Sequence, residues 1–330
     1  MLIHLINHSS KELGGAQKIL KLLYDDNAEE SKIISFDYIL DKNGQRRSST
    51  LYAFLLFAIE LIKNPNNTFI IHHRMFLLPF ILTRRINAIF VCHSIFPNKN
   101  YIFSLLSNTK CIAVSPEVKN YLLDLNPKLN VVTISNGVSS NPSENFEHLD
   151  NDLFEVGYIG RLGVEKGIDV LLDAFIIFSK QNSHIKTKLH IVGSGELESL
   201  LLAKIQSEQM EGTIVLHGYS ETPFTTLKNI DLLVVPSQYE GFGLVFYEAL
   251  ERRHMVLASN IPVFRKKDND AGVYFFTPND PIDLVEKITT CYKNQKNWLD
   301  NNNTPTKRHD FFTVDEMLSR YKTVLKVHAK

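Results

Sequence analysis

Two glutamates stand eight residues apart around a glycine-rich step in the segment SQYEGFGLVFYEAL, residues 237–250. The apolar run DLLVVPS leads into this segment and has the character of a β-strand. Glu240 would lie in the loop after that strand, where a carboxylate can accept hydrogen bonds from sugar hydroxyls. Glu248 would lie about one turn inside the next helix, suited to accept both hydroxyls of a ribose. An isolated glutamate on a helix is usually a solvated side chain, but here several features coincide at one strand end.

The glycines of this segment add an anion-binding element. Gly241 and Gly243 free the backbone, so the amide groups from Phe242 to Val245 can point at a ligand. The helix that follows aims the positive end of its dipole at the same place. The segment is therefore suited to a ligand that carries both an anionic group and hydroxyls.

A second loop carries two cations. In GYIGRLGVEKGIDVLLDAF, residues 157–175, Arg161 directly follows a predicted strand and Lys166 stands five residues later, just before a helix. Arginine, with its planar fork, and lysine, as a point charge, could hold a diphosphate from two sides. A solvated charged loop explains the same pattern equally well.

Two further loops give weaker signals. Gly14 and Gly15 precede a helix after the first predicted strand, and Gly193 and Gly195 open another helix in HIVGSGELESLL. Paired glycines before a helix let backbone amides approach a phosphate. A plain tight turn fits each pair as well.

The elements that must position these residues alternate along the whole chain. Such alternation of strands and helices predicts a doubly wound α/β fold, in which ligands bind beyond the carboxyl ends of the strands. The predicted strands are LIHLI, KIISF, TFIIHH, AIFVCH, CIAVS, VVTIS, EVGYIG, KLHIVG, TIVLHG, DLLVVPS, MVLAS and VYFF. The predicted helices are 15–24, 51–62, 116–125, 167–181, 196–209, 244–252, 281–296 and a final amphipathic helix near 314–328.

A polar stretch, SSNPSENFEHLDND at 139–152, interrupts the series and is interpreted as a linker. We therefore expect two Rossmann-like domains that face each other across a cleft, 1–145 and 146–310. A second polar run, 294–310, precedes the final segment 311–330, whose helix we expect to pack back towards the N-terminal domain.

Composition excludes several classes of protein. The chain has 36 basic and 36 acidic residues, so it is not a general nucleic-acid binder. Its three cysteines are far apart and show no metal-ligand spacing, and the N-terminus lacks the basic region of a signal peptide. The most apolar segment, 51–62, is too short to span a bilayer. A reduced, cytoplasmic location is expected.

Taken in order, these motifs resemble a known family. The E-x7-E arrangement from Glu240 to Glu248, GRLGVEKG at 160–167, NGV at 136–138 and GGAQ at 14–17 are similar to the family 4 retaining glycosyltransferases, nucleotide-sugar enzymes of the two-domain GT-B fold. Each motif alone is weak, but together they are fairly specific. The resemblance is strong from 156 to 250 and thin from 18 to 130, where such enzymes vary with their acceptors.

The resemblance assigns roles to individual residues. Glu248 would bind the ribose of the donor, and Glu240 the hydroxyls of the transferred sugar. Arg161 and Lys166 would neutralise the diphosphate leaving group, and Gly15 would approach that diphosphate from the N-terminal domain.

The same resemblance completes the site. His93, at the end of AIFVCH, matches a histidine near the donor sugar, although a histidine at a strand end is more often structural. The resulting catalytic set is His93, Glu240, Arg161 and Lys166. The donor-binding set is Gly15, Arg161, Lys166, Gly193, Glu240, Gly241, Phe242, Gly243, Leu244, Val245 and Glu248.

The chain also departs from the family pattern. The glycine and proline that usually follow the motif helix are replaced by RRHMVLAS, and a later glycine pair appears as SNIPVF. These replacements put the shape of the loops at 252–266 in doubt. The chain is also short for the family, mostly in its N-terminal half.

The reaction implied is metal-independent and needs no cofactor. Two D-x-D triplets, Asp150–Asp152 and Asp268–Asp270, lie in polar stretches and are interpreted as solvated turns. The resemblance implies retention by same-face attack, with the departing phosphate taking the acceptor proton. The donor would be a nucleotide-diphosphate hexose or N-acetylhexosamine, with UDP favoured because it is common.

Two other classes remain to be weighed. A nucleotide-sugar 2-epimerase shares this architecture but needs no acceptor surface, whereas the N-terminal half here is basic and apolar. A periplasmic sugar-binding protein would show a signal peptide and no paired cations at a strand end. A glycosyltransferase is therefore the first choice and the epimerase the alternative.

One local charge bias bears on the acceptor. Between Lys63 and Lys128 there are eight basic and two acidic residues, a net charge of +6, and Arg74, Arg84, Arg85 and Lys99 stand beside aromatic and aliphatic side chains. Buried helices account for much of this apolar character. A partly exposed surface of this kind predicts peripheral contact with an anionic membrane and a glycan acceptor that is lipid-linked, of the O-antigen, lipopolysaccharide or capsule type.

Overall fold

The computed structural model describes residues 1–7, 14–35, 50–64, 66–77, 80–81, 87–96, 101–106, 109–139, 152–265, 272–301 and 312–328. The chain divides into two compact units. Unit 1 comprises Met1–Gly137 and Phe311–Lys330, and unit 2 comprises Val138–Asp310. The expected boundary between residues 145 and 146 lies outside the described residues, as does nearly all of the expected linker.

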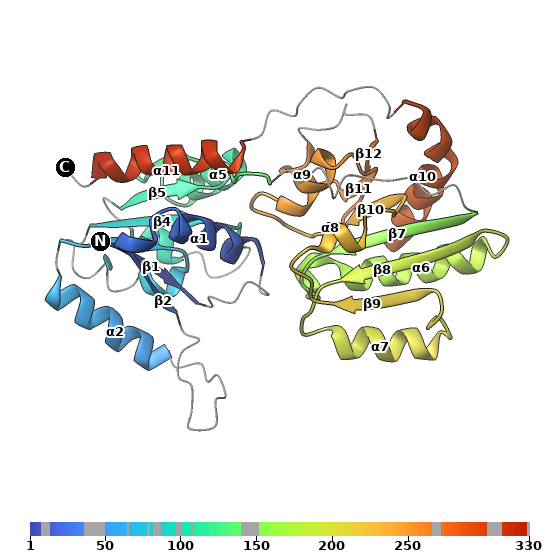
Figure 1. Cartoon of the computed structure of the whole chain (residues 1–330), viewed down its shortest axis with the longest axis horizontal. Helices are drawn as coiled ribbons and strands as arrows, with labels where there is room; N and C mark the ends of the chain where they lie inside the picture. Colours follow the sequence, from blue (N-terminus) through green and yellow to red (C-terminus); the bar gives the residue numbers. More distant parts are fainter. Residues whose placement is uncertain are drawn as a thin grey trace. The chain divides into compact units, whose positions relative to one another are not determined.

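Within the described residues, unit 1 is built on a six-stranded parallel sheet in the order β2-β1-β3-β4-β5-β6 (Figure 1). Every residue of the central strand β4 is buried, as expected of parallel strands that helices cover on both faces. The strands are β1 (Leu2–Ile6), β2 (Ser31–Ser35), β3 (Thr68–Ile71), β4 (Ala88–Cys92), β5 (Lys110–Ala113) and β6 (Asn130–Thr133).

One helix of unit 1 begins at a clear side-chain cap. At the start of α5 (Pro116–Leu125), Ser115 Oγ accepts a hydrogen bond from the Val118 amide, and proline occupies the first turn. The other helices whose bounds are described are α1 (Gly15–Asp25), α2 (Thr50–Lys63), α4 (Tyr101–Ser104) and α11 (Val314–His328), with 3-10 turns η2 (Ala28–Glu30) and η3 (Arg74–Phe76).

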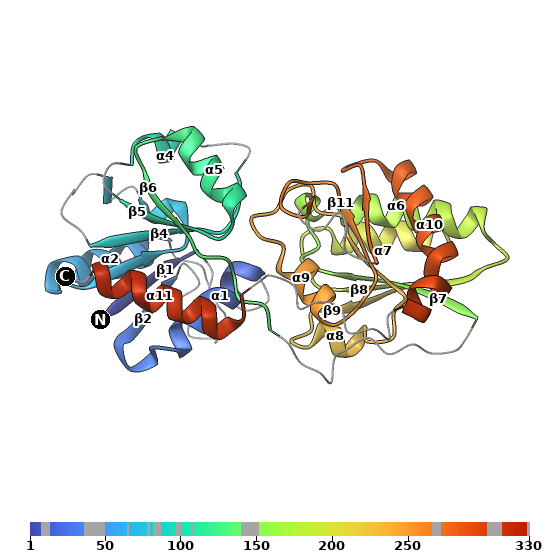
Figure 2. The same cartoon turned by 90° about the horizontal axis from the view of Figure 1, so that it is seen from above.

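The last helix, α11, belongs to unit 1 although it follows all of unit 2 in the sequence. It begins with a capping box in which Thr313 and Glu316 exchange hydrogen bonds. Tyr321 is almost fully buried, and the Gly137 amide lies 3.1 Å from Met317 Sδ. Figures 1 and 2 show α11 beside α1, where Lys322 Nζ lies 2.8 Å from Asp26 Oδ1.

Unit 2 is built on another parallel sheet, whose order in the described residues is β12-β11-β10-β7-β8-β9. Two of its inner strands, β10 and β11, are buried on both faces, with all four residues of each buried. They are β7 (Leu153–Ile159), β8 (Lys186–Val192), β9 (Ile214–Gly218), β10 (Leu232–Val235), β11 (Val256–Ser259) and β12 (Val273–Phe276).

Helices α6 and α10 lie side by side against the sheet of unit 2 (Figures 1 and 2). Phe154 of β7 packs between them, with its ring 5.2 Å from Tyr292 and 6.2 Å from Phe178. The helices of this unit are α6 (Ile168–Gln181), α7 (Glu198–Ser207), α8 (Pro223–Thr226), α9 (Leu244–Glu251) and α10 (Pro281–Asn301), with the 3-10 turn η5 (Val164–Lys166).

The doubly wound α/β fold expected from the sequence is confirmed, with one difference in the extent of a helix. The helix predicted at 281–296 continues to Asn301, further into the polar run that begins at 294. Its added turns are held by packing rather than by propensity. Gln295 donates a hydrogen bond to Asp231, and Trp298 lies against the core so closely that a Cβ on Gly272 would come within 2.2 Å of its Nε1.

Candidate functional site

The candidate site of unit 2 lies where its strand order reverses. The chain passes from β7 to β8 and β9 on one side, and then returns to β10 on the other side of β7. The loops that follow β7 and β10 therefore leave the same sheet edge next to each other and diverge. In open α/β sheets this switch point is where ligands bind.

The loop after β7, residues 160–167, is held in a fixed shape. Tyr158, which is buried, donates a hydrogen bond from its hydroxyl to the Arg161 carbonyl at 2.8 Å. Gly167 has φ 64° in the left-handed region, and a Cβ there would lie 2.1 Å from the Pro236 carbonyl oxygen. Only glycine fits this position, because any side chain would collide with the loop after β10.

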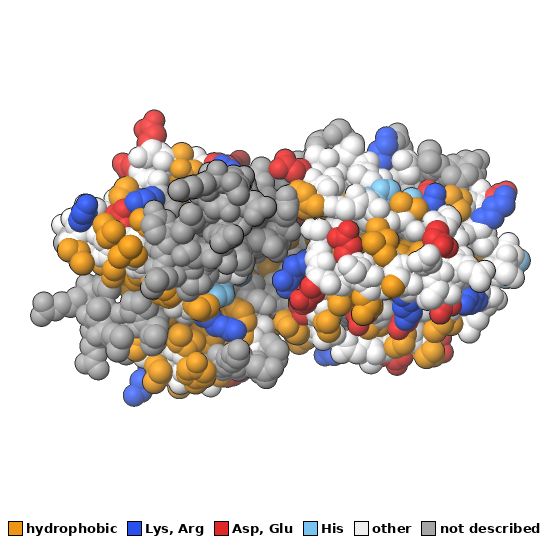
Figure 3. All heavy atoms as spheres, turned by 90° about the horizontal axis from the view of Figure 1, so that it is seen from below, with side chains coloured by type: hydrophobic (Ala, Val, Ile, Leu, Met, Phe, Trp, Pro, Cys, Tyr) orange, Lys and Arg blue, Asp and Glu red, His pale blue; other side chains and the backbone are white. Residues whose placement is uncertain are grey.

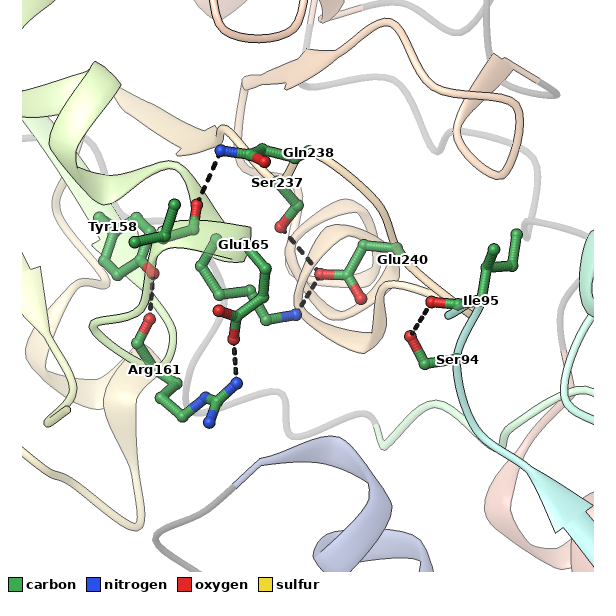
Figure 4. Close-up of polar contacts among 10 residues, drawn as sticks. Ser94, Ile95, Tyr158, Arg161, Glu165, Ser237, Gln238 and Glu240 are labelled. Carbon is green, nitrogen blue, oxygen red and sulfur yellow. Dashed lines mark hydrogen bonds and ion pairs between the residues drawn. The ribbon is translucent and has the colours of Figure 1, made fainter. Parts of the chain in front are cut away.

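Polar contacts join this loop to the loop after β10 (Figure 4). The Gln238 backbone amide donates to the Glu165 carbonyl, and its side-chain amide donates to the Val164 carbonyl, both at 3.0 Å. Lys166 Nζ lies 2.5 Å from Glu240 Oε1, which also accepts a hydrogen bond from Ser237 Oγ at 2.9 Å. The two loops thus form one connected polar surface.

The cations expected to bind a diphosphate already have anionic partners in this surface. Arg161 pairs with Glu165 on its own loop, and Lys166 pairs with Glu240 across the two loops. The Arg161 side chain is 45% exposed and the Lys166 side chain 28%, so both remain accessible. An anion that binds here would have to compete with the Glu165 and Glu240 carboxylates for these two cations. Once displaced, the carboxylates could accept other hydrogen bonds.

Helix α9 begins at the same strand end. Gly243 precedes it with φ 80° and ψ 56°, and a Cβ at this position would lie 2.3 Å from Phe264 Cε1. The amides of the first helical residues, Leu244 and Val245, belong to the turn that has no intrahelical acceptors. The helix start therefore offers N–H donors and a positive dipole end beside the two loops.

The remaining residues of the E-x7-E segment are fixed by burial. Gly241 is buried, and the ring of Phe242 packs on Tyr247 at 4.8 Å. Glu248 lies in α9, about a turn after the helix start, and is only 6% exposed. The predicted glutamates and both cations thus gather on the loops and helix that follow β7 and β10. Their contacts with a donor stay predictions.

The glycines at 193 and 195 have a visible structural role. A Cβ on Gly193 would lie 1.8 Å from the Gly160 carbonyl oxygen, and one on Gly195 would lie 2.5 Å from the Leu162 carbonyl oxygen. The Leu162 amide also donates to the Ser194 carbonyl at 2.9 Å. These glycines let the loop after β8 pack on the loop after β7. A direct donor contact by Gly193 stays a prediction.

Two predicted site residues belong to unit 1. Gly15 is the first residue of α1, and residues 8–13, which complete its loop, are outside the described residues. His93 directly follows β4, and its Nε2 lies 2.9 Å from His72 Nδ1. Burial lowers the pKa of His93 to about 4, so its imidazole is neutral at physiological pH.

The region that departs from the family pattern, residues 252–266, has a defined shape up to residue 265. Arg252 is buried and donates to the Ser139 and Glu248 carbonyls at 2.9 and 3.1 Å, and its guanidinium lies 4.5 Å from the Phe224 ring. The arginine that replaces the usual residues therefore holds the end of α9 against α8. This anchoring role was not expected from the sequence.

Sequence reasoning also missed the residues that hold the loops together. Gln238 contacts a segment that is distant along the chain, whereas Tyr158, Glu165 and Ser237 contact residues three or four positions away. Only their position at strand ends could have signalled them. Of the D-x-D aspartates, only Asp152 is described, and the described residues contain no cluster of metal-ligating side chains.

Together, fold and geometry define an α/β domain with a glycine-rich candidate site, which carries both cations and carboxylates, at its switch point. The chain belongs to the family described as glycosyl transferases group 1, whose model matches residues 141–307. The described helices include none with the length and apolar character needed to cross a membrane.

Curated relatives support this membership over part of their length. The poly(ribitol-phosphate) alpha-N-acetylglucosaminyltransferase of Staphylococcus aureus (strain COL) is 32% identical over 169 residues, 50% of this chain and 33% of that protein. The O-antigen biosynthesis glycosyltransferase WclY of Escherichia coli is 24% identical over 227 residues, 65% of this chain and 60% of that protein. The chain thus spans between a third and 60% of the length of these relatives.

Solved structures share the fold. Anabaena Alr3699/HepE in complex with UDP and glucose superposes with a TM-score of 0.73 at 16% identity, covering 99% of this chain and 100% of that chain. At this identity the likeness concerns the fold alone.

Proposed function

We propose that the chain is a retaining glycosyltransferase that moves a hexose or N-acetylhexosamine from a nucleotide-diphosphate sugar, with UDP favoured, to a glycan acceptor. The observation that carries the proposal is the convergence of Arg161, Lys166, Glu240 and the start of α9 at the switch point of unit 2. UDP is favoured because the Anabaena structure of the same fold contains UDP and glucose.

The ion pair between Lys166 and Glu240 suggests how the site receives a donor. Without ligand, each charge neutralises the other at 2.5 Å. A diphosphate carries more negative charge than one carboxylate, so it would take Lys166 and release Glu240. The released carboxylate could then accept hydrogen bonds from the sugar hydroxyls, which makes diphosphate and sugar recognition interdependent.

The chemistry that follows needs a stabilised leaving group. The bond between the anomeric carbon and the phosphate oxygen breaks, and the acceptor oxygen forms its bond on the same face. The departing diphosphate takes the acceptor proton. Arg161, Lys166 and the amides at Leu244 and Val245 would stabilise the charge that grows on the phosphate, and this requires no metal.

The acceptor is proposed to be a glycan, and the names of the relatives support this class. The Escherichia coli relative acts in O-antigen biosynthesis and the Staphylococcus aureus relative is named for poly(ribitol-phosphate). Each of the two is named a glycosyltransferase, so the epimerase alternative gains no support. A lipid-linked acceptor at the inner face of the cytoplasmic membrane remains part of the proposal.

Peripheral membrane contact is supported by an apolar stripe on α2. Leu55, Ile59 and Ile62 are 55%, 37% and 81% exposed and stand at the spacing of one helix face. Apolar side chains gather over α2 on the left of the face shown in Figure 3. The cations Arg84, Arg85 and Lys99 of the basic window lie outside the described residues.

The donor site can be tested by nucleotide-dependent stability. UDP, GDP and ADP are screened for a shift in unfolding, and a ligand at 100 times its Kd adds about 2.7 kcal/mol. We expect stabilisation by UDP, and its loss in Lys166→Met. Lys180→Met is the matched control, because Lys180 makes an ion pair with Glu208 at the same 2.5 Å. Equal stabilisation of both variants would contradict the assignment of the diphosphate site.

The reaction and the membrane contact need their own experiments. Nuclear magnetic resonance of the product should show the anomeric configuration of the donor, and an inverted product would refute retention. The protein should sediment with anionic vesicles at low salt, and less so for Ile62→Asp or for the double variant Arg84→Glu, Arg85→Glu. Equal, negligible sedimentation in every sample would remove the membrane contact.

A further inference from the structure

Three histidines form a column in unit 1, of which His4 and His72 are buried and His93 is partly exposed. His4 Nδ1 lies 3.1 Å from His72 Nε2, and His72 Nδ1 lies 2.9 Å from His93 Nε2. The planes of neighbouring rings are nearly parallel, with centroids 5.4 and 5.2 Å apart and interplanar angles of 18° and 21°. The middle ring thus uses both of its nitrogens to contact its neighbours.

The register of the sheet explains why the three side chains meet. His4 pairs with Ile70 on β3, so His72 follows two positions later and points to the same face. Ile71 pairs with Phe90 on β4, so His72 falls opposite Val91 and His93 again follows two positions later. The column therefore runs across β1, β3 and β4, and in register each histidine lies two positions further towards the carboxyl ends of the strands than the one before.

This place is the switch point of unit 1. The chain passes from β1 to β2 on one side and returns to β3 on the other side of β1. The column begins on the two strands that flank this point and ends directly after β4. It thus lies at the sheet edge where an α/β domain presents its ligand-contacting groups.

Burial fixes the number of protons in the column. It lowers the pKa of His4 and His93 to about 4 and that of His72 well below its usual value, so at neutral pH each ring carries one proton. His72 must therefore donate to one neighbour and accept from the other. Both hydrogen bonds run in one direction, and all three rings carry the same tautomer, either Nδ1–H or Nε2–H.

The two ends of the column are polar atoms without partners. His4 Nε2 and His93 Nδ1 are buried, and neither has a hydrogen-bond partner among the described residues. A buried polar atom without a partner is costly, so each needs an explanation. Because both hydrogen bonds run in the same direction, a proton on His4 Nε2 leaves His93 Nδ1 as an acceptor. Without that proton, His93 Nδ1 is a donor.

We propose that His72 and His4 are positioning residues for His93, holding its ring by Nε2 so that Nδ1 can contact a hydroxyl of the transferred sugar. A hydroxyl can donate to this nitrogen or accept from it, so either direction of the column gives a hydrogen bond. The contact with sugar rests on the proposed function, whereas the column itself does not.

The column can be tested in the free protein by nitrogen-15 resonance of the histidine side chains. We expect His4, His72 and His93 to be neutral at pH 7 and to show one shared tautomer. We also expect His4→Leu to change the nitrogen-15 chemical shifts of His93, although His4 contacts His93 only through His72. Opposite tautomers at His4 and His93, or an unchanged His93 in His4→Leu, would overturn the column.

The effect on the reaction is measured with two variants at position 72. In His72→Leu, kcat/KM should fall about tenfold, equivalent to about 1.4 kcal/mol, while the Kd for UDP changes by less than about twofold. His72→Asn, whose amide can still contact His93 Nε2, should recover most of the loss. Loss of UDP affinity together with activity would indicate a merely structural role and overturn the positioning role.

A matched control exists in unit 2. The rings of His190 and His217 have the same geometry as those of His72 and His93, with centroids 5.2 Å apart, an interplanar angle of 21° and a nitrogen–nitrogen distance of 2.9 Å. His217→Leu should leave kcat/KM unchanged, and an equal loss there would also overturn the positioning role. If the wild-type protein neither binds UDP nor consumes its sugars, the proposed function fails with the sugar contact, and the resonance experiment still decides the column.

Discussion

Replacing Gly243 by alanine should destabilise unit 2 by about 2–5 kcal/mol, the sum of two separate costs. The backbone at Gly243 has φ 80° and ψ 56°, and an alanine in this region costs about 1–2 kcal/mol. The new Cβ would also lie 2.3 Å from Phe264 Cε1. Phe264 is fully buried and stacked on Phe246 at 4.5 Å, so moving it costs about a further 1–3 kcal/mol.

Two other glycines of unit 2 separate these costs. Gly218 has φ 70° but open space around a Cβ, so Gly218→Ala should lose only about 1–2 kcal/mol. Gly212 has open space and no left-handed backbone, so Gly212→Ala should keep its stability or gain up to about 1 kcal/mol. The difference between Gly243→Ala and Gly218→Ala then measures the collision with Phe264.

The assay uses the single tryptophan of the chain. Trp298 lies in α10 and packs against the core of unit 2, so its fluorescence during urea unfolding reports on that unit. Midpoints are compared at equal slopes. If Gly243→Ala loses no more stability than Gly218→Ala, Phe264 moves freely and the reasoning about the tight turn before α9 is refuted.

Further predictions concern the proposed site and the buried histidines. Glu248→Gln should weaken UDP binding by roughly tenfold or more in calorimetry, because a charged hydrogen bond contributes about 1.5–3 kcal/mol; unchanged affinity would contradict the ribose role. Arg161→Ala and Lys166→Ala should lower kcat more than donor affinity in steady-state kinetics, and activity should persist in EDTA; effects on KM alone, or a strict metal requirement, would count against the leaving-group role. Burial lowers the pKa of His4 and His93 to about 4, so below pH 6.5 the unfolded chain binds more protons than the folded chain. As the pH is lowered from 6.5 to 4, the free energy of unfolding should therefore fall by about 1.4 kcal/mol per pH unit and per histidine. A free energy of unfolding that does not change with pH, measured by urea unfolding with circular dichroism, would contradict this.

The fold could be predicted because several of its inner strands are apolar on both faces. Runs such as AIFVC of β4 and LLVV of β10 are read directly as buried parallel strands, and both are buried throughout. The end of α10 could not be predicted in this way. Its last turns are polar in sequence, and they are helical because Trp298 and Gln295 find partners on distant segments.

The placement of the candidate site residues at strand ends was predictable, but their arrangement was not, and their contacts with a donor stay predictions. Glycines beside Glu240 and before α9 mark a turn that only glycine allows, and the structure contains that turn at Gly243. The pairing of Lys166 with Glu240 could not be anticipated, because it depends on β7 and β10 being neighbours. The histidine column likewise depends on strand register, which a single sequence does not specify.

The return of α11 to unit 1 has a consequence for the order in which the protein can fold. During synthesis, Met1–Gly137 leave the ribosome first, yet Met317 and Tyr321 of their core are made after all of unit 2. Unit 2, whose residues are continuous, can complete its core as soon as they emerge. Residues Met1–Gly137 instead keep apolar surface exposed until α11 has been synthesised. We therefore expect this part of the chain to depend on chaperones.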